Sequence, residues 1–227
     1  MIKKVLAGIT FTLLLAILSA CGSSDPFADF EEFQGDVSEP SVSVQNLPDE
    51  PTKDEMKSQI RNSSTNDIST IIGDNFNLLE TVKGENNIAI VYATNKFTVS
   101  ELVSTLTSTV EPKQQSELID NQQVLIYPDH FVTIKQSEED PDSTLIEVAS
   151  DQFVRDNYSP SFLQTYFALK ILDDVLDVDD WAKKRKSKCA DGSCYGGYST
   201  TKKYNSGGLN TNRGMSSVRG GGPSAGK

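Results

Sequence analysis

The residues of this 227-residue chain that could do chemistry are few: three cysteines (Cys21, Cys189 and Cys194) and a single histidine, His130. His130 follows Tyr127-Pro128-Asp129 in a turn between two apolar segments. A catalytic or metal-binding histidine normally needs partners that converge from elsewhere in the fold. No Gly-x-Ser-x-Gly turn follows a predicted strand to supply a nucleophile. We therefore expect a turn or packing role for His130, and we predict no catalytic residue, metal or other cofactor. A hydrolase that uses His130 is the alternative.

Cys189 and Cys194 are separated by four residues that include the turn-forming pair Asp191-Gly192. In an oxidising compartment such a pair favours a small disulfide loop. A redox-active pair would more often have Cys-x-x-Cys spacing in a thioredoxin-like context. We expect a structural disulfide, and an envelope thiol-disulfide enzyme that uses these two cysteines remains the alternative.

Cys21 ends the sequence Leu18-Ser19-Ala20-Cys21, which follows two lysines and an apolar run from Val5 to Ile17. A basic start, a short apolar core and small residues before the cut are typical of a secretory signal. The run is also shorter than the roughly 20 apolar residues of a spanning helix. The four residues match the bacterial lipobox, whose thiol takes a diacylglyceryl group. We expect residues 1–20 to be a lipoprotein signal peptide, with acyl chains such as palmitate on Cys21. These would hold the protein on the extracytoplasmic face of the cell membrane.

Charge divides the remaining chain into two parts. Residues 22–180 hold 9 basic and 31 acidic residues, a net charge of −22, whereas residues 181–227 hold 10 basic and 1 acidic, a net charge of +9. Residues 21–65 have little apolar periodicity and predict an acidic disordered tether, although residues 55–60 could form a short helix. Residues 181–227 predict a basic, Gly/Ser-rich disordered tail that contains the possible disulfide loop. This tail could contact anionic lipids or wall polymers, but an extracellular location argues against nucleic acid.

Residues 66–180 have the pattern of one packed domain. Apolar runs predict strands at residues 76–82, 88–93, 123–127, 131–135 and 145–149. A capping box at Thr98 and Glu101 begins a helix over residues 99–108, and Ser159-Pro160 begins a longer helix to about Val178. The order predicts an α+β fold: a small, mainly antiparallel sheet with helices packed on one face.

Several segments resemble a known family. They are the lipobox, residues 127–133, residues 153–162 and the ending at residues 219–223. They are similar to an uncharacterised family of bacillus-type membrane lipoproteins, classed only as a domain of unknown function. The resemblance implies membrane attachment and no established activity, cofactor or catalytic residues.

These observations favour a non-enzymatic binding or accessory component of the cell envelope. It would contact membrane lipid through acylated Cys21 and a protein partner that the sequence does not identify.

Overall fold

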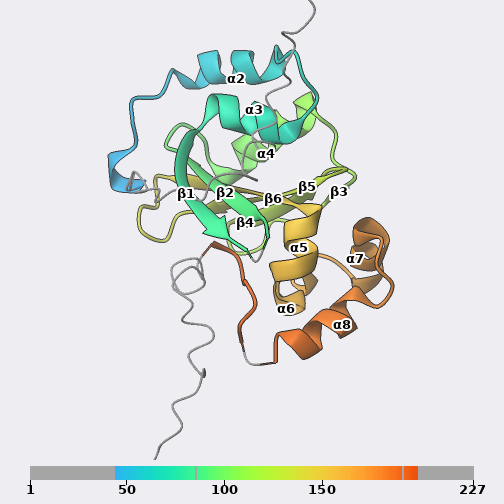
Figure 1. Ribbon diagram of the computed structural model, residues 1–227. Helices are drawn as coiled ribbons and strands as arrows, with labels where there is room; N and C mark the ends of the chain where they lie inside the picture. The colour runs from blue at the N-terminus through green and yellow to red at the C-terminus, as the bar shows by residue number, and fades with distance from the viewer. Residues whose placement is uncertain (1–43, 85, 191, 199–227) are drawn as a thin grey trace, which may run out of the picture. The chain divides into compact units, whose positions relative to one another are not determined.

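The computed structural model describes residues 44–84, 86–190 and 192–198. In this part of the chain a six-stranded sheet lies between two layers of helices (Figure 1). Residues 1–20, Cys21, the first part of the expected tether and residues 199–227 lie outside the described residues. Within the described ranges, no helix has the length and apolar character needed to cross a membrane.

The sheet is antiparallel between every pair of neighbouring strands, in the order β1-β2-β6-β5-β4-β3. Its strands are β1 (Asn77–Lys83), β2 (Ile88–Thr94), β3 (Gln114–Gln115), β4 (Gln122–Ile126), β5 (His130–Gln136) and β6 (Thr144–Ser150). Strand β6 is central and pairs with β2 on one side and β5 on the other. The apolar runs that predicted β2, β4, β5 and β6 are largely buried, whereas the run that predicted β1 lies at a partly exposed edge of the sheet.

One layer of helices comes from the part of the chain before β4. It contains the helices α2 (Lys53–Arg61), α3 (Ile68–Asn75) and α4 (Val99–Thr109). The short 3₁₀ helix η2 (Val44–Asn46) precedes them, and its Val44 is buried in the core on the other face of the sheet. The predicted capping box at the start of α4 is present, because the Thr98 side chain accepts from the Glu101 N–H and the Glu101 carboxylate accepts from the Thr98 N–H. The helices of this layer bury apolar side chains such as Met56, Ile71 and Leu102.

The second layer follows β6 and contains α5 (Asp151–Asn157), α6 (Pro160–Gln164), α7 (Leu169–Leu176) and α8 (Trp181–Lys188). The long helix expected over residues 160–178 is instead two helices, because the chain becomes extended at Ala168. The break allows Leu163 and Phe167 before it, and Leu172 and Leu176 after it, to be buried in one core.

The predicted α+β class is confirmed, with an antiparallel sheet. The helices, however, pack on both faces of the sheet and not on one (Figure 1). The reason is that β2 is apolar on both faces: Ala89, Val91 and Ala93 belong to the core under α5–α8, whereas Tyr92 lies on the side of α3. A strand that is apolar on both faces requires cover on both faces.

Two described segments that flank the expected domain of residues 66–180 also contribute buried side chains. Helix α2, placed in the expected tether, buries Met56 and Ile60 completely. Trp181 and Tyr195, placed in the expected tail, are 3% and 0% exposed. Each of these segments contributes only a few buried apolar residues. Because the rest of each segment is polar, its composition alone does not indicate that it packs against the domain.

Candidate functional site

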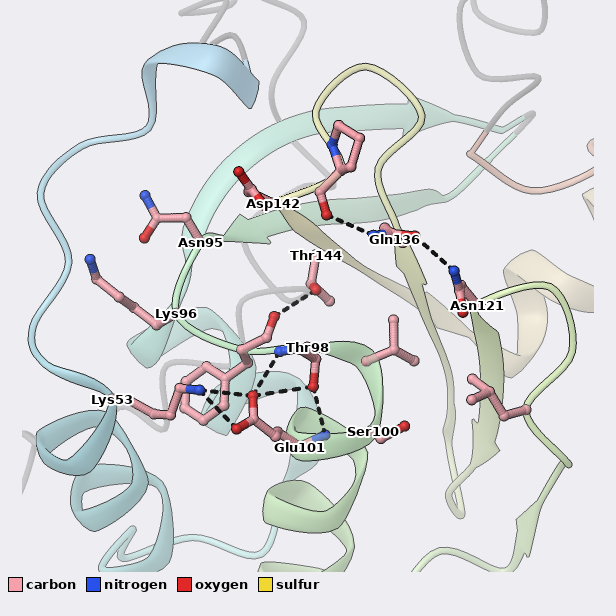
Figure 2. Close-up of a pocket in the computed structure, with 14 residues that line it drawn as sticks. Lys53, Asn95, Lys96, Thr98, Ser100, Glu101, Asn121, Gln136, Asp142 and Thr144 are labelled. Atoms are coloured by element: carbon pink, nitrogen blue, oxygen red, sulfur yellow. Dashed lines mark hydrogen bonds and ion pairs between the residues drawn. The ribbon is translucent and has the colours of Figure 1, made fainter.

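A groove of about 360 Å³ lies at the end of the sheet where β2 leads into α4 (Figure 2). Four segments that are distant in sequence form its walls: Lys53 of α2, residues 95–101, residues 118–121, and residues 136–144 between β5 and β6. Most of the lining side chains are amides, hydroxyls or charged groups.

The first wall is held by Glu101. Lys53 Nζ lies 2.8 Å from both carboxylate oxygens of Glu101, which also accepts a bond from the Thr98 N–H at 3.0 Å. The hydrogen bond from Lys53 is the main cause that lowers the pKa of Glu101 to about 2, followed by that from Thr98. Glu101 therefore stays ionised and connects α2 to the start of α4.

The opposite wall is a chain of amide hydrogen bonds between loops (Figure 2). Asn121 Nδ2 donates to Gln136 Oε1 at 2.8 Å, and Gln136 Nε2 donates to the Pro141 carbonyl at 2.7 Å. Thr144 Oγ1 donates to the Phe97 carbonyl at 2.7 Å and so fixes the loop after β2. These groups can hold a small polar ligand by hydrogen bonds, with Lys96 and Asp142 supplying charges of both signs.

His130 lies outside this groove, at the start of β5. Its carbonyl accepts a bond from the Tyr127 N–H at 2.8 Å, which closes the predicted turn. Its charge acts on Asp67, the N-cap of α3, which accepts bonds from Ser69 Oγ at 2.6 Å and the Thr70 N–H at 2.7 Å. Burial tends to raise the pKa of Asp67, but these bonds and His130 together lower it. Among the described residues no group of three or more ligating side chains could hold a metal.

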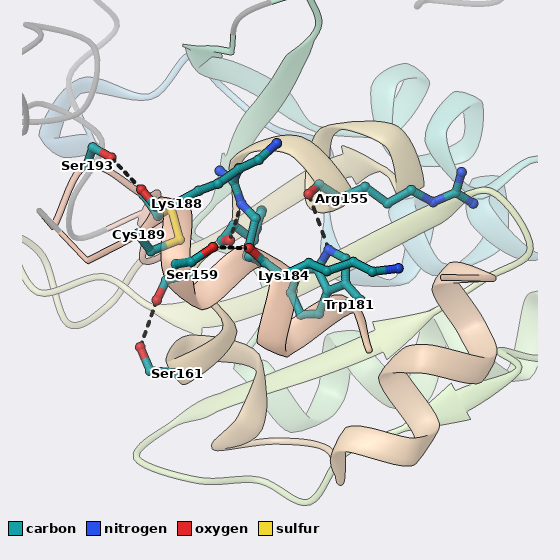
Figure 3. Close-up of a disulfide and its surroundings, with 12 residues drawn as sticks. Arg155, Ser159, Ser161, Trp181, Lys184, Lys188, Cys189 and Ser193 are labelled. Atoms are coloured by element: carbon teal, nitrogen blue, oxygen red, sulfur yellow. Dashed lines mark hydrogen bonds between the residues drawn. A yellow bond between two sulfur atoms is a disulfide. The ribbon is translucent and has the colours of Figure 1, made fainter. Parts of the chain in front are cut away.

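Cys189 and Cys194 form a disulfide with a Cα–Cα distance of 5.1 Å (Figure 3). Cys189 is the C-cap of α8, and Gly192 in the loop has φ +73°, a conformation that favours glycine. Directly after Cys194, the Tyr195 N–H donates to the Asn157 carbonyl at 2.8 Å, and the Tyr195 carbonyl accepts from the Ser159 N–H at 2.7 Å. The disulfide loop thus ends one residue before Tyr195, whose backbone is hydrogen-bonded to the segment between α5 and α6.

Glu147 is a buried titratable residue that the sequence did not single out. It lies at the centre of β6, is 2% exposed, and accepts a hydrogen bond from the Tyr158 hydroxyl at 2.6 Å. Burial raises its pKa to about 7, against the opposing effects of Tyr158, Tyr195 and Lys135. A signal was available, because alternation places Glu147 on the same face as the apolar residues Leu145 and Ala149.

The aromatic rings of Phe153, Tyr158 and Tyr195 pack together beside this carboxylate, with centroids 5.1 to 6.0 Å apart. Glu147 therefore lies under the layer of α5–α8, away from the groove.

The fold defines an α+β domain in which a six-stranded antiparallel sheet separates two helical layers. A family model described as "Domain of unknown function (DUF4247)" matches residues 58–227 of this chain. Because the match spans most of the sequence, the chain belongs to this family of unknown function. No curated protein and no solved structure matched it.

Proposed function

We propose that the protein is a lipid-anchored component of the cell envelope, held on the extracytoplasmic face of the membrane by acylated Cys21. The observation that carries the proposal is the sequence Leu18-Ser19-Ala20-Cys21 after a basic start and a short apolar core. The Cys189–Cys194 disulfide supports it, since disulfides persist in oxidising compartments outside the cytoplasm.

In this proposal the domain binds a partner or a small polar ligand and catalyses no reaction. The groove between α2, α4 and the β5–β6 loop supports a binding role, because its walls are hydrogen-bonding side chains held by the Lys53–Glu101 ion pair. Sites that bind small molecules are commonly concave with a few convergent polar groups. The basic residues after Lys188 would add contacts to anionic lipids or wall polymers.

The anchor is tested by Cys21→Ser in cells, with membranes separated from soluble material. We expect the natural protein in the membrane fraction, and we expect a block of the lipoprotein signal peptidase with globomycin to leave a longer precursor. Cys21→Ser should leave the signal uncut at this site and unacylated, so the chain should not take up labelled palmitate. Ser23→Ala, two residues away, is the matched control and should be processed normally. Palmitate labelling of Cys21→Ser, or processing that ignores globomycin, would contradict the proposal.

The thiol-disulfide alternative has one observation in its favour: both cysteines of the disulfide are partly exposed. Thiol trapping in cells separates the two functions. A structural disulfide should be oxidised in nearly all molecules and should form no mixed disulfide. A Cys194→Ser variant that captures a partner protein through Cys189 would favour the redox function.

A further inference from the structure

The exposed side of α8 is the strongest basic feature of the described domain. Five of its eight residues are basic, and they lie at consecutive or next-nearest positions: Lys183, Lys184, Arg185, Lys186 and Lys188. The four lysines are exposed, and none of them forms an ion pair with a carboxylate in the described part of the chain. Together these four lysines form the α8 lysine face.

The α8 lysine face is held rigidly on the domain. Trp181 and Ala182 are buried, the Trp181 indole N–H donates to the Arg155 carbonyl at 3.2 Å, and Arg185 Nε donates to the Tyr158 carbonyl at 3.2 Å. The disulfide closes the loop directly after the helix (Figure 3). Because one side of α8 is fixed by these contacts, the lysines are directed outward from a fixed helix.

The charge of the surrounding domain favours one orientation of the domain toward an anionic surface. Residues 22–180 carry a net charge of −22, so most orientations of the domain are repelled by an anionic surface. Acidic residues flank α8 in the chain, at Asp173 to Asp180 before it and at Asp191 after it, and Asp173 is engaged with the Trp181 N–H at 3.0 Å. The lysines follow at the C-terminal end of α8, and the chain beyond them is also basic. Approach with α8 first is therefore the electrostatically favoured orientation.

We propose that the α8 lysine face binds the phosphate headgroups of anionic phospholipids and orients the domain on the bilayer. The inference rests on the proposed anchor at Cys21, which selects lipid over other polyanions. The 23 Cα–Cα steps from Cys21 to Val44 span at most about 80 Å, so the anchor limits how far the start of the domain can move from the headgroups. Each basic residue near an anionic bilayer increases the binding of the protein to that bilayer roughly fivefold. Salt screens this attraction.

The test measures how fast each lysine reacts with a water-soluble acylating reagent. The natively processed full chain is purified from membranes and added to vesicles of phosphatidylcholine alone, or of phosphatidylcholine with a third of phosphatidylglycerol. Mass spectrometry then reports the rate at each lysine. We expect the α8 lysine face to react at least fivefold more slowly on the anionic vesicles, and high salt should remove the difference. Lys57 and Lys113, which lie outside the α5–α8 layer, should react equally on both.

Two variants test whether charge causes the protection. In Lys183→Gln with Lys186→Gln, the remaining Lys184 and Lys188 should lose most of their protection on anionic vesicles. In the matched control, Lys57→Gln with Lys113→Gln, the same loss of charge outside the α5–α8 layer should leave their protection unchanged. Equal loss in both variants would show an effect of total charge and would overturn the proposed face.

Other outcomes separate this inference from the anchor. Equal reaction rates on both kinds of vesicle would overturn the α8 contact. Protection by soluble polyglycerol phosphate but not by anionic vesicles would also overturn it, in favour of a wall polymer. Loss of the protein from neutral vesicles would contradict the lipid anchor, whereas fivefold protection on anionic vesicles in the same experiment would still support the α8 contact.

Discussion

Among single residues, Glu147 is expected to affect how stability depends on pH near neutrality, because its buried carboxyl has a raised pKa. Its carboxyl is buried among aromatic rings and has a pKa near 7, compared with an ordinary value of 4.5. The folded state therefore binds this proton more tightly than the unfolded chain does. It follows that the contribution is fully favourable below about pH 4.5 and is lost as the pH rises through 7.

We predict that Glu147→Gln raises the free energy of unfolding at pH 8 by up to a few kcal/mol, and changes it little at pH 4.5. The amide keeps an acceptor for the Tyr158 hydroxyl but carries no charge to bury. Urea unfolding of both proteins across this pH range is the measurement. The control is Glu138→Gln, which removes the exposed carboxylate that forms an ion pair with Lys135. It should not raise the free energy of unfolding at pH 8. A variant that is destabilised at pH 8 would mean that the carboxylate is needed in its ionised form.

At the scale of elements, α4 depends on the cap that also forms one wall of the groove. Thr98 accepts from the Glu101 N–H, and Glu101 in turn accepts from Lys53 of α2. We predict that Thr98→Ala lowers the free energy of unfolding by about 1 kcal/mol, since an N-cap hydroxyl is lost. Thr98→Ser keeps the hydroxyl and should differ from the natural protein by less than half of that. Chemical unfolding at pH 7 measures both, and equal stability of Thr98→Ala and the natural chain would contradict the role of the cap.

The disulfide acts on the segment that joins α8 to Tyr195. Closing a loop of six residues is expected to contribute about 2 kcal/mol. We predict that Cys189→Ser with Cys194→Ser lowers the free energy of unfolding by about that amount, and that the variant no longer responds to reductant. The natural protein should lose a similar amount when it is reduced. If reduction leaves its melting temperature unchanged, the bond does not constrain the unfolded chain in this way.

At the scale of the whole molecule, the folding unit includes segments that look like linkers. Helix α2 buries Met56 and Ile60. Tyr195, directly after Cys194, is fully buried, and its backbone is hydrogen-bonded to Asn157 and Ser159. We predict that residues 44–198 unfold cooperatively as an isolated fragment, whereas residues 66–180 do not. Thermal unfolding followed by circular dichroism compares the two. A sharp transition in the fragment of residues 66–180 would contradict this prediction. A third fragment, residues 44–180, measures how much α8 and Tyr195 contribute to the stability of the domain.

Local patterns in the sequence were sufficient to predict most of the strands and the start of α4. Runs such as Ile88–Ala93 and Leu145–Ala149 predict buried strands because nearly all of their residues are apolar. The Thr98–Glu101 cap is readable because both partners lie within one turn. The turn at Pro128–His130 and the pairing of Cys189 with Cys194 are also local in the chain.

The sequence by itself determined the class of fold and the separation of acidic from basic charge, since each depends on residue type or on neighbours in the chain. The lipid attachment proposed at Cys21 also rests on the sequence alone. Only the tertiary structure decided that helices cover both faces of the sheet, that Glu147 is buried beside Tyr158, and that Lys53 meets Glu101. Those contacts join residues 11 and 48 positions apart. These contacts depend on how the helices pack on the sheet and on one another. The local periodicity of the sequence does not predict which residues meet.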